Sequence, residues 1–328
     1  MPLSTLPPGF TLRRPTLDDV PIVAELIKIR DETYFGFRRA TEENLRHGWS
    51  MPGEDLEHDA WLIFAPEGQL VGLINIGKFS MPMLYATAVV HPDYAHLGLD
   101  AYLLELAEAR ARELIEQAPA GARVALNTFN TDNNQTYLQT IEQAGFAYVR
   151  SQWRMQIDMT EPPPVPVWPE GIILRPFTLD MAHAVYEADD EAFKDHWGHV
   201  TMPFDLFEHW FIKTPEFDPT LWFVPMEGEQ IAGCTLCYLD EQGFGWCGGL
   251  SILRPWRRKG IALAMLQHAF GEFYRRGIHR VALDVDAASL TGATRLYEKA
   301  GMHIVYQENQ YQKELRPGVE MTTQMLEE

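Results

Sequence analysis

Apolar and polar positions in the second half of the chain follow two periods, one typical of helices and one typical of strands. Residues 260–274 place apolar side chains at the spacing of one buried helical face, and helices are also predicted over Met181–Phe193 and Ala293–Ala300. Short apolar runs bounded by turn residues predict strands, with a Glu227-Gly228 hairpin turn between two of them. These strands span Ile172–Pro176, Leu221–Val224, Ile231–Leu239, Trp246–Leu253 and Arg280–Val285, followed by a strand-rich tail over Met302–Glu314. Strands before and between helices predict an α/β (α+β) fold with a mixed sheet.

The chain repeats itself with an offset of about 160 residues, the size of a common domain. Four features recur in the same order: residues 12–18 as 174–180, 61–72 as 222–233, Gly98 as Gly260, and 144–146 as 300–302. Features that recur in the same order and with nearly the same offset indicate a tandem duplication.

Prolines crowd the segment between the two copies. Residues 162–169 read Pro-Pro-Pro-Val-Pro-Val-Trp-Pro, which predicts an extended, semi-rigid connector. We therefore expect an N-terminal domain over residues 1–160, a proline-rich linker over 161–170 and a C-terminal domain over 171–328.

The composition excludes several classes of protein. With 46% apolar residues the chain can bury a core, and a net charge of −19 disfavours non-specific attraction to nucleic acid or anionic lipid. We see no secretory signal and no window of about 20 apolar residues, so we expect a soluble cytoplasmic protein without a membrane span. Three cysteines offer too few disulfide bonds to stabilise a chain of this size. Cys234 and Cys237 would point to opposite faces of a strand, which predicts core cysteines and no metal site.

One segment carries a pattern that suits a phosphate. A strand ends near Leu253, a basic turn over 254–259 follows, and a helix begins at Gly260. The amides at such a helix start are unpaired and point outward, and the helix dipole adds positive potential. Gly260 and Ala262 would let a ligand approach the backbone closely. The alternative is a solvated basic turn that caps a core helix.

Here the sequence resembles a known family. Arg257-x-x-Gly260-x-Ala262 fits the Gln/Arg-x-x-Gly-x-Gly/Ala motif of GNAT-type N-acyltransferases, and residues 286–302 resemble their second motif. The tandem layout and Phe193–Gly198 look like the mycothiol-synthase-like branch of tandem acetyltransferases. The resemblance implies two tandem GNAT-like domains, each with a mixed, mostly antiparallel sheet flanked by helices.

The resemblance also implies acetyl-CoA as co-substrate, without a metal, between two splayed strands. The pantetheine arm would lie along Leu250, Ser251 and Ile252, and Ser289 stands where the family has asparagine. The backbone of Arg257, Arg258, Lys259, Gly260, Ile261, Ala262 and Leu263 would hold the pyrophosphate.

Tyr297 stands where the family places the general acid that protonates the departing CoA thiolate. The alternative for Tyr297 is a core residue on an amphipathic helix.

A general base is not evident from the sequence. Many relatives carry a glutamate on the strand before the cofactor loop, but residues 245–249 read Gly-Trp-Cys-Gly-Gly. The proton of an amine acceptor would then leave through water or through a residue elsewhere. The candidates are Asp284, Asp286, Asp195, His196 and Glu241.

The first copy departs from both motifs. Ala95 takes the position of Arg257, and Asp100 takes that of Ala262, where a carboxylate would repel a pyrophosphate. We expect a degenerate copy that serves as a scaffold for the active half.

These observations predict an acetyl-CoA-dependent N-acetyltransferase that acts on a primary amine of a small molecule through its C-terminal domain. Transfer to a peptide or protein amine, and a non-catalytic acyl-CoA-binding module, are the alternatives. We expect a monomer or a homodimer.

Overall fold

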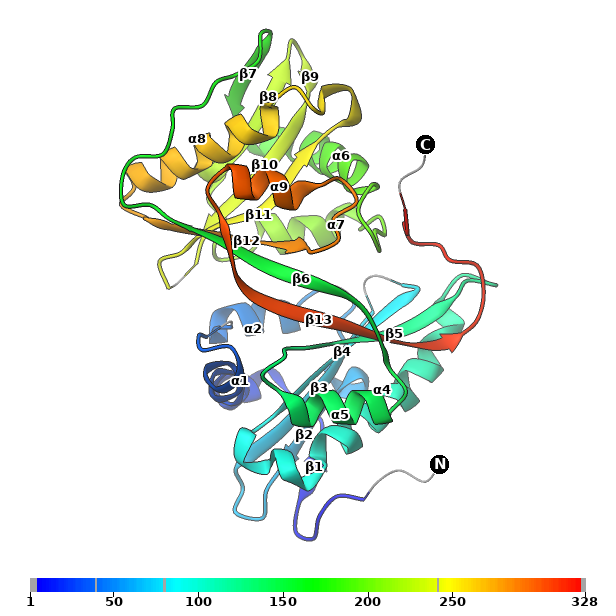
Figure 1. Cartoon of the computed structure of the whole chain (residues 1–328). Coiled ribbons are helices and arrows are strands. Elements are labelled where there is room, and N and C mark those ends of the chain that lie inside the picture. The colour runs from blue at the N-terminus through cyan, green and yellow to red at the C-terminus, as the bar shows by residue number, and fades with distance from the viewer. Residues whose placement is uncertain (1–4, 39, 79–80, 241, 326–328) are drawn as a thin grey trace. The chain divides into compact units, whose positions relative to one another are not determined.

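The computed structural model describes residues 5–38, 40–78, 81–240 and 242–325. Two compact units make up the chain (Figure 1). Unit 1 consists of Met1–Ser151 and Glu308–Met321, and unit 2 consists of Gln152–Gln307 and Thr322–Glu328.

The sheet of unit 1 contains one parallel pair among antiparallel neighbours. Its order is β1-β2-β3-β4-β5, and the second part of β13 completes it. Only β4 and β5 run parallel, and they pair over Met83–Tyr85 alone. The strands are β1 (Thr11–Arg13), β2 (Ala60–Phe64), β3 (Leu70–Gly77), β4 (Met83–Val90), β5 (Val124–Asn130) and β13 (His303–Arg316).

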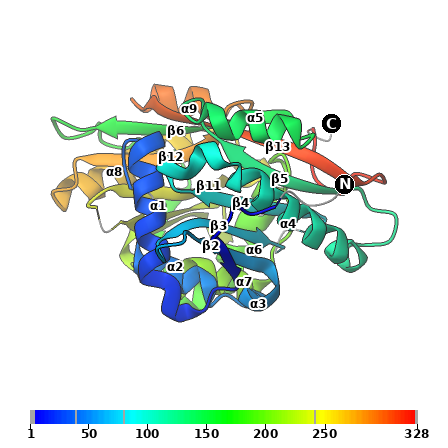
Figure 2. The same cartoon turned by 90° about the horizontal axis from the view of Figure 1, so that it is seen from below.

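Helices cover both faces of this sheet (Figures 1 and 2). The side chains of α1 and α2 share a buried cluster with Leu62 and Leu73 on one face, while those of α4 and α5 pack with Ile63 and Ile74 on the other. These side chains alternate along β2 and β3, as expected for strands buried on both faces. The helices are α1 (Val20–Tyr34), α2 (Glu42–Trp49), α3 (Leu56–Asp59), α4 (Leu99–Leu114) and α5 (Gln135–Gln143), with short 3-10 turns over Leu17–Asp19, Pro92–Leu97 and Ile115–Gln117.

Unit 2 repeats the arrangement. Its sheet has the order β6-β12-β11-β10-β8-β7, with β9 paired to β8, and β11 and β12 form the parallel pair. The strands are β6 (Ala147–Asp158), β7 (Ile172–Pro176), β8 (Trp222–Glu227), β9 (Gln230–Ile231), β10 (Gly233–Leu239), β11 (Gly245–Ile252) and β12 (Arg280–Asp286).

The helices of unit 2 also form two layers. The cluster with α6 and α7 contains Cys234 and Leu236, and the cluster with α8 and α9 contains Cys237 and Cys247. The helices are α6 (Ala182–Phe193), α7 (Phe204–Phe207), α8 (Ile261–Arg275) and α9 (Ala293–Lys299), with a π-helical turn over Glu208–Ile212 and 3-10 turns over Leu179–Met181, Pro219–Leu221 and Arg254–Trp256. The predicted fold class, a mixed and mostly antiparallel sheet flanked by helices, is confirmed.

The units exchange their last strands, which differs from the predicted division at residues 160–170. Residues 152–158 of β6 pair with β12 in unit 2, and residues 309–316 of β13 pair with β5 in unit 1. The chain therefore enters unit 2 before the prolines, and the proline-rich segment lies inside that unit. Trp168 packs there against the buried cluster that contains Ile261 and Met265.

The cysteines are free and buried, as the sequence predicts. In the described part of the chain no helix is long and apolar enough to cross a membrane.

Unit 1 contains an acid whose titration should be visible in its stability. Burial raises the pKa of Glu54 to about 7, against the opposing attraction of Lys78. The unfolded chain releases this proton near pH 4.5, so the free energy of unfolding should fall between about pH 4.5 and 7. Glu54→Gln is expected to raise the free energy of unfolding by about 2 kcal/mol at pH 8 and to leave it unchanged at pH 4.

Urea unfolding of both proteins between pH 4 and 8 measures this difference. Glu57→Gln, at an exposed position of α3, is the matched control and should leave the pH profile unchanged. A Glu54→Gln profile parallel to that of the wild type would contradict the assignment.

Candidate functional site

In unit 2 the parallel strands β11 and β12 separate after two residue pairs. Gly245 and Trp246 pair with β12, and no residue of β11 beyond Trp246 does so. The register of β11 against β10 shifts at this point, because Gly248 is an extra residue between Cys247 and Gly249. A β-bulge of this kind bends a strand and ends its pairing. Among the described residues, β11 therefore has an edge without a strand partner over residues 247–252.

The loop after β11 turns through two left-handed residues. Arg258 has φ 62° and Gly260, the N-cap of α8, has φ 91°. Within the described residues, the backbone N–H groups from Arg258 to Leu263 donate to no acceptor. These amides surround the N-terminus of α8, where the helix dipole favours an anion. The predicted positions Arg258, Lys259, Gly260, Ile261, Ala262 and Leu263 thus lie together in one turn.

The side chain of Arg257 lies on the other side of this turn and is used within the protein. Its Nε donates to the carbonyl oxygen of Ile252 at 2.9 Å and its Nη2 to that of Ala192 at 3.2 Å. Its Nη1 and the guanidinium of Arg254 bind the carboxylate of Asp195. Of the four basic side chains of the loop, Arg258 and Lys259 have no ion-pair partner among the described residues.

The three residues predicted along the pantetheine arm face different ways. Leu250 and Ile252 pack toward α8, while Ser251 is buried on the face of α6. The hydroxyl of Ser251 lies 3.1 Å from the thiol of Cys234, which donates to Asp189 Oδ1 at 3.4 Å. Desolvation raises the pKa of Asp189 to about 6. Sequence reasoning missed this polar group, because no spacing links α6 to β10.

Tyr297 is buried on α9, facing the cluster that contains Cys247. Within the described residues its hydroxyl has no hydrogen-bond partner, and the residue shares a buried cluster with Cys247 of β11. Burial raises the pKa of Tyr297 above its usual range. The phenol of Tyr297 therefore keeps its proton and can donate it, and it lies beside β11, the strand that separates from β12.

Asp286 and Ser289 cap local turns. Asp286 Oδ1 accepts the backbone N–H of Ala288 at 3.0 Å, and Ser289 Oγ accepts that of Ala293 at 3.3 Å. Ser289 thus lies at the start of α9, where the family has asparagine.

Two further candidate bases are held by arginines. Asp284 accepts two hydrogen bonds from Arg154, at 2.9 and 3.0 Å. The hydrogen bonds from Arg254, together with the one from Arg257, lower the pKa of Asp195 to about 2. His196 is different, because desolvation lowers its pKa to about 4 and its ring nitrogens have no hydrogen-bond partner among the described residues. Glu241 lies outside the described residues.

The corresponding site in unit 1 is filled by the protein itself. Asp100, at the second position of α4, is 4% exposed and accepts the backbone N–H of Ala101 at 2.9 Å and the hydroxyl of Thr140 at 2.8 Å. Burial raises the pKa of this carboxyl. β4 has no bulge against β3, and Thr128 of β5 bonds both to the carbonyl of Ala86 on β4 and to the hydroxyl of Tyr137. The first bond joins β5 to β4 just beyond their last residue pair, and the second joins β5 to α5.

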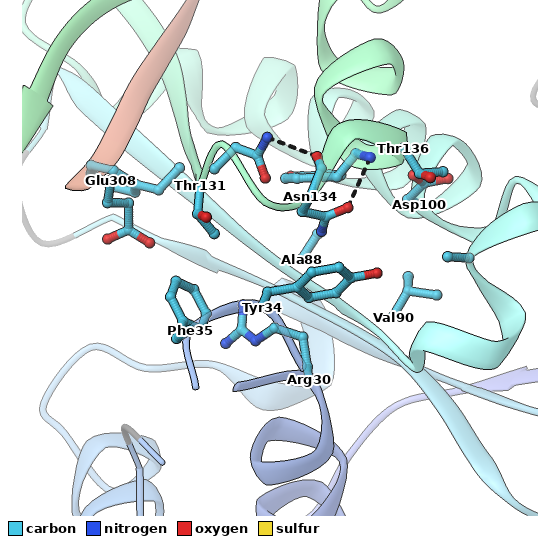
Figure 3. Close-up of a pocket in the computed structure, with 14 residues that line it drawn as sticks. Arg30, Tyr34, Phe35, Ala88, Val90, Asp100, Thr131, Asn134, Thr136 and Glu308 are labelled. Atoms are coloured by element: carbon cyan, nitrogen blue, oxygen red, sulfur yellow. Dashed lines mark hydrogen bonds between the residues drawn. The ribbon is translucent and has the colours of Figure 1, made fainter. Parts of the chain in front are cut away.

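A small pocket remains beside these hydrogen bonds. Figure 3 shows the ring of Tyr34, from α1, lying across it between Arg30 and Asn134. The space left for water is about 40 Å³, enough for about three molecules. The lining also includes Asp100, Tyr137 and Glu308. The carboxylate of Asp100 lines this space, and it would repel the negative charge of a pyrophosphate.

Comparisons with known proteins point to one family. The acetyltransferase (GNAT) family model matches residues 182–302, which lie within unit 2. One similar protein of known crystal structure is a GCN5-related N-acetyltransferase from Sphaerobacter thermophilus, whose sequence is 36% identical to this chain. The match covers 97% of this chain and 100% of that one, with a TM-score of 0.82.

Two curated relatives are more distant. The mycothiol acetyltransferase of Thermobispora bispora is 28% identical over 229 residues, which are 65% of this chain and 70% of the relative. That of Catenulispora acidiphila is 25% identical over 307 residues, which are 88% and 94%.

Proposed function

Because the chain belongs to the GCN5-related N-acetyltransferase family, we propose that unit 2 transfers the acetyl group of acetyl-CoA directly to a primary amine of a small molecule. The observation that carries this proposal is the turn after β11, with its unpaired amides from Arg258 to Leu263 at the start of α8. An anion of the size of a pyrophosphate meets several N–H donors there, together with the free charges of Arg258 and Lys259.

The pantetheine arm follows the open edge of β11. Residues 250–252 have no strand partner on the side of β12, so their backbone can form strand-like hydrogen bonds with the amides of the arm. The thioester then lies near the bulge at Gly248, where the two strands part. Tyr297 is on the same side of this strand, since it packs in one buried cluster with Cys247, the residue before the bulge.

Transfer proceeds by attack of the amine nitrogen on the thioester carbonyl carbon. As the N–C bond forms, the amine nitrogen releases one proton to water. The C–S bond breaks, and the Tyr297 hydroxyl donates its proton to the CoA thiolate as it leaves and then regains a proton from solvent. Unit 1 takes no part in the chemistry, because Asp100 and the Thr128–Tyr137 bridge occupy its corresponding cleft. We assign unit 1 the role of a scaffold.

Small-molecule amines are the proposed acceptors because both mycothiol acetyltransferases named above match most of their own length to this chain. Isothermal titration with acetyl-CoA, followed by acceptor-dependent release of free CoA across a panel of amines, tests the proposal. We expect saturable binding of acetyl-CoA, and faster CoA release with small amines than with peptides that have a free N-terminus. Absence of acetyl-CoA binding would refute the proposal, and faster turnover of the peptides would replace the small-molecule acceptor by a peptide.

A further inference from the structure

The carboxylate of Asp195 is buried near the end of α6, and both of its oxygens accept hydrogen bonds. It is 3% exposed and lies two residues beyond the helix. Arg254 donates to both of its oxygens, from Nη2 to Oδ1 at 2.6 Å and from Nε to Oδ2 at 3.0 Å. Arg257 donates to Oδ2 through Nη1. A buried carboxylate held by two guanidinium groups has a fixed position, because each bond is charge-assisted and directional.

Arg257 connects this carboxylate to the strand that precedes the loop. Its guanidinium also donates to the carbonyl oxygens of Ile252, at the end of β11, and Ala192, in the last turn of α6. One side chain therefore fixes the distance between the end of β11, the end of α6 and the loop.

The loop needs such external support. Arg258 has a left-handed backbone conformation that costs a residue with a side chain about 1 kcal/mol. Within the described residues the following amides have no acceptor to hold them in place. Contacts from outside the loop must therefore keep the amides directed at one point.

We propose that Asp195 is a positioning residue for the CoA-binding turn: through Arg254 and Arg257 it sets the course of residues 254–259, so that the amides of 258–263 converge on the pyrophosphate. This inference rests on the proposed function of unit 2. It assigns to Asp195 a role at the cofactor in place of the base role considered from the sequence.

Charge and position predict opposite effects of removing this carboxylate. Asp195 contributes one negative charge beside two guanidinium groups next to the anion site, so by charge alone Asp195→Asn would strengthen the binding of acetyl-CoA. If Asp195 positions the turn, the same substitution weakens binding, because the amides lose their common direction.

The test uses the full chain and two ligands that differ in the pyrophosphate. Isothermal titration gives the Kd of acetyl-CoA, and a ligand-observed NMR titration in the millimolar range gives that of S-acetylpantetheine, which has no pyrophosphate. For Asp195→Asn we expect the Kd of acetyl-CoA to rise about tenfold, the change typical of losing hydrogen bonds to a charged group. The Kd of S-acetylpantetheine should stay within about twofold of the wild-type value, since no contact to the turn is involved.

Glu191→Gln is the matched control, because it removes one negative charge from an exposed position of the same helix. It should leave both dissociation constants unchanged. Arg257→Lys is the second variant and serves also if Asp195→Asn does not fold, because it keeps the positive charge but cannot make all three contacts. It should raise the Kd of acetyl-CoA in the same direction.

Tighter binding of acetyl-CoA by Asp195→Asn would overturn the inference in favour of a charge effect. An equal loss of affinity for S-acetylpantetheine would overturn it in favour of a general structural role. Failure of the wild-type chain to bind acetyl-CoA at all would instead refute the proposed function, so the two failures are distinguishable.

Discussion

Replacing Ala262 with aspartate is expected to abolish the binding of acetyl-CoA. The chain already contains this arrangement in unit 1, where Asp100 holds the corresponding position and accepts the backbone N–H of Ala101. A carboxylate about 5 Å from a bound phosphate costs roughly 3 kcal/mol at an effective dielectric constant of about 20. It also competes for the helix amides that the phosphate needs. We therefore expect the Kd of acetyl-CoA to rise at least about 100-fold.

Isothermal titration measures this change, and Ala262→Ser is the matched control. Serine adds a small neutral group to a half-buried position, so binding should stay within about threefold of the wild type. Asp100→Asn, made in parallel, should leave acetyl-CoA binding unchanged. Binding that survives Ala262→Asp unchanged would contradict the placement of the pyrophosphate at the start of α8.

The local elements of unit 2 could be predicted from the sequence because their signals are local. The apolar spacing over 260–274 gave a helix that the structure places at Ile261–Arg275, and the predicted strand Ile172–Pro176 has the same bounds in the structure. Periodicity reports which side of an element is buried, and each of these elements packs on one side or both.

The exchange of the last strands could not be predicted in this way. β6 and β13 are strands by their composition, but the alternation of their side chains does not say which neighbour they pair with. Both strands are long enough to leave the unit in which they begin, and residues 152–158 and 309–316 pair with β12 and β5 respectively. The proline-rich segment suggested a boundary because prolines are common between domains, yet it only connects β6 to β7.

The motif located the turn that we propose binds CoA, but it did not show what each side chain of that turn contacts. The run of basic residues over 254–259 indicates a local concentration of positive charge, but not which of its side chains are already paired within the protein. In the structure Arg254 and Arg257 both form ion pairs with Asp195, which lies about 60 residues before them in the sequence. Similarly, the sequence does not show that Asp284 accepts two hydrogen bonds from Arg154. Partners brought by tertiary structure decide what a charged residue can do, and no sequence spacing reports them.

Tyr297→Phe is expected to lower kcat by about 100-fold or more, with little change in the KM for acetyl-CoA. The substitution removes one oxygen from a buried ring and leaves the apolar contacts of α9 in place. No hydrogen bond within the described residues is lost, because the hydroxyl of Tyr297 has none there. The thiolate of CoA must then leave without a proton donor, which slows the step in which the C–S bond breaks.

The pH dependence provides an independent check of the same role. Burial raises the pKa of Tyr297, so the phenol keeps its proton beyond the pH of about 10 at which an exposed tyrosine loses it. The kcat of the wild type should therefore show no alkaline decline from this group between pH 7 and 10. Tyr274→Phe, which removes a phenol at the edge of the same cluster, is the matched control and should keep wild-type turnover. A Tyr297→Phe variant with unchanged kcat would reduce Tyr297 to a core residue, and the proton would then reach the thiolate from solvent.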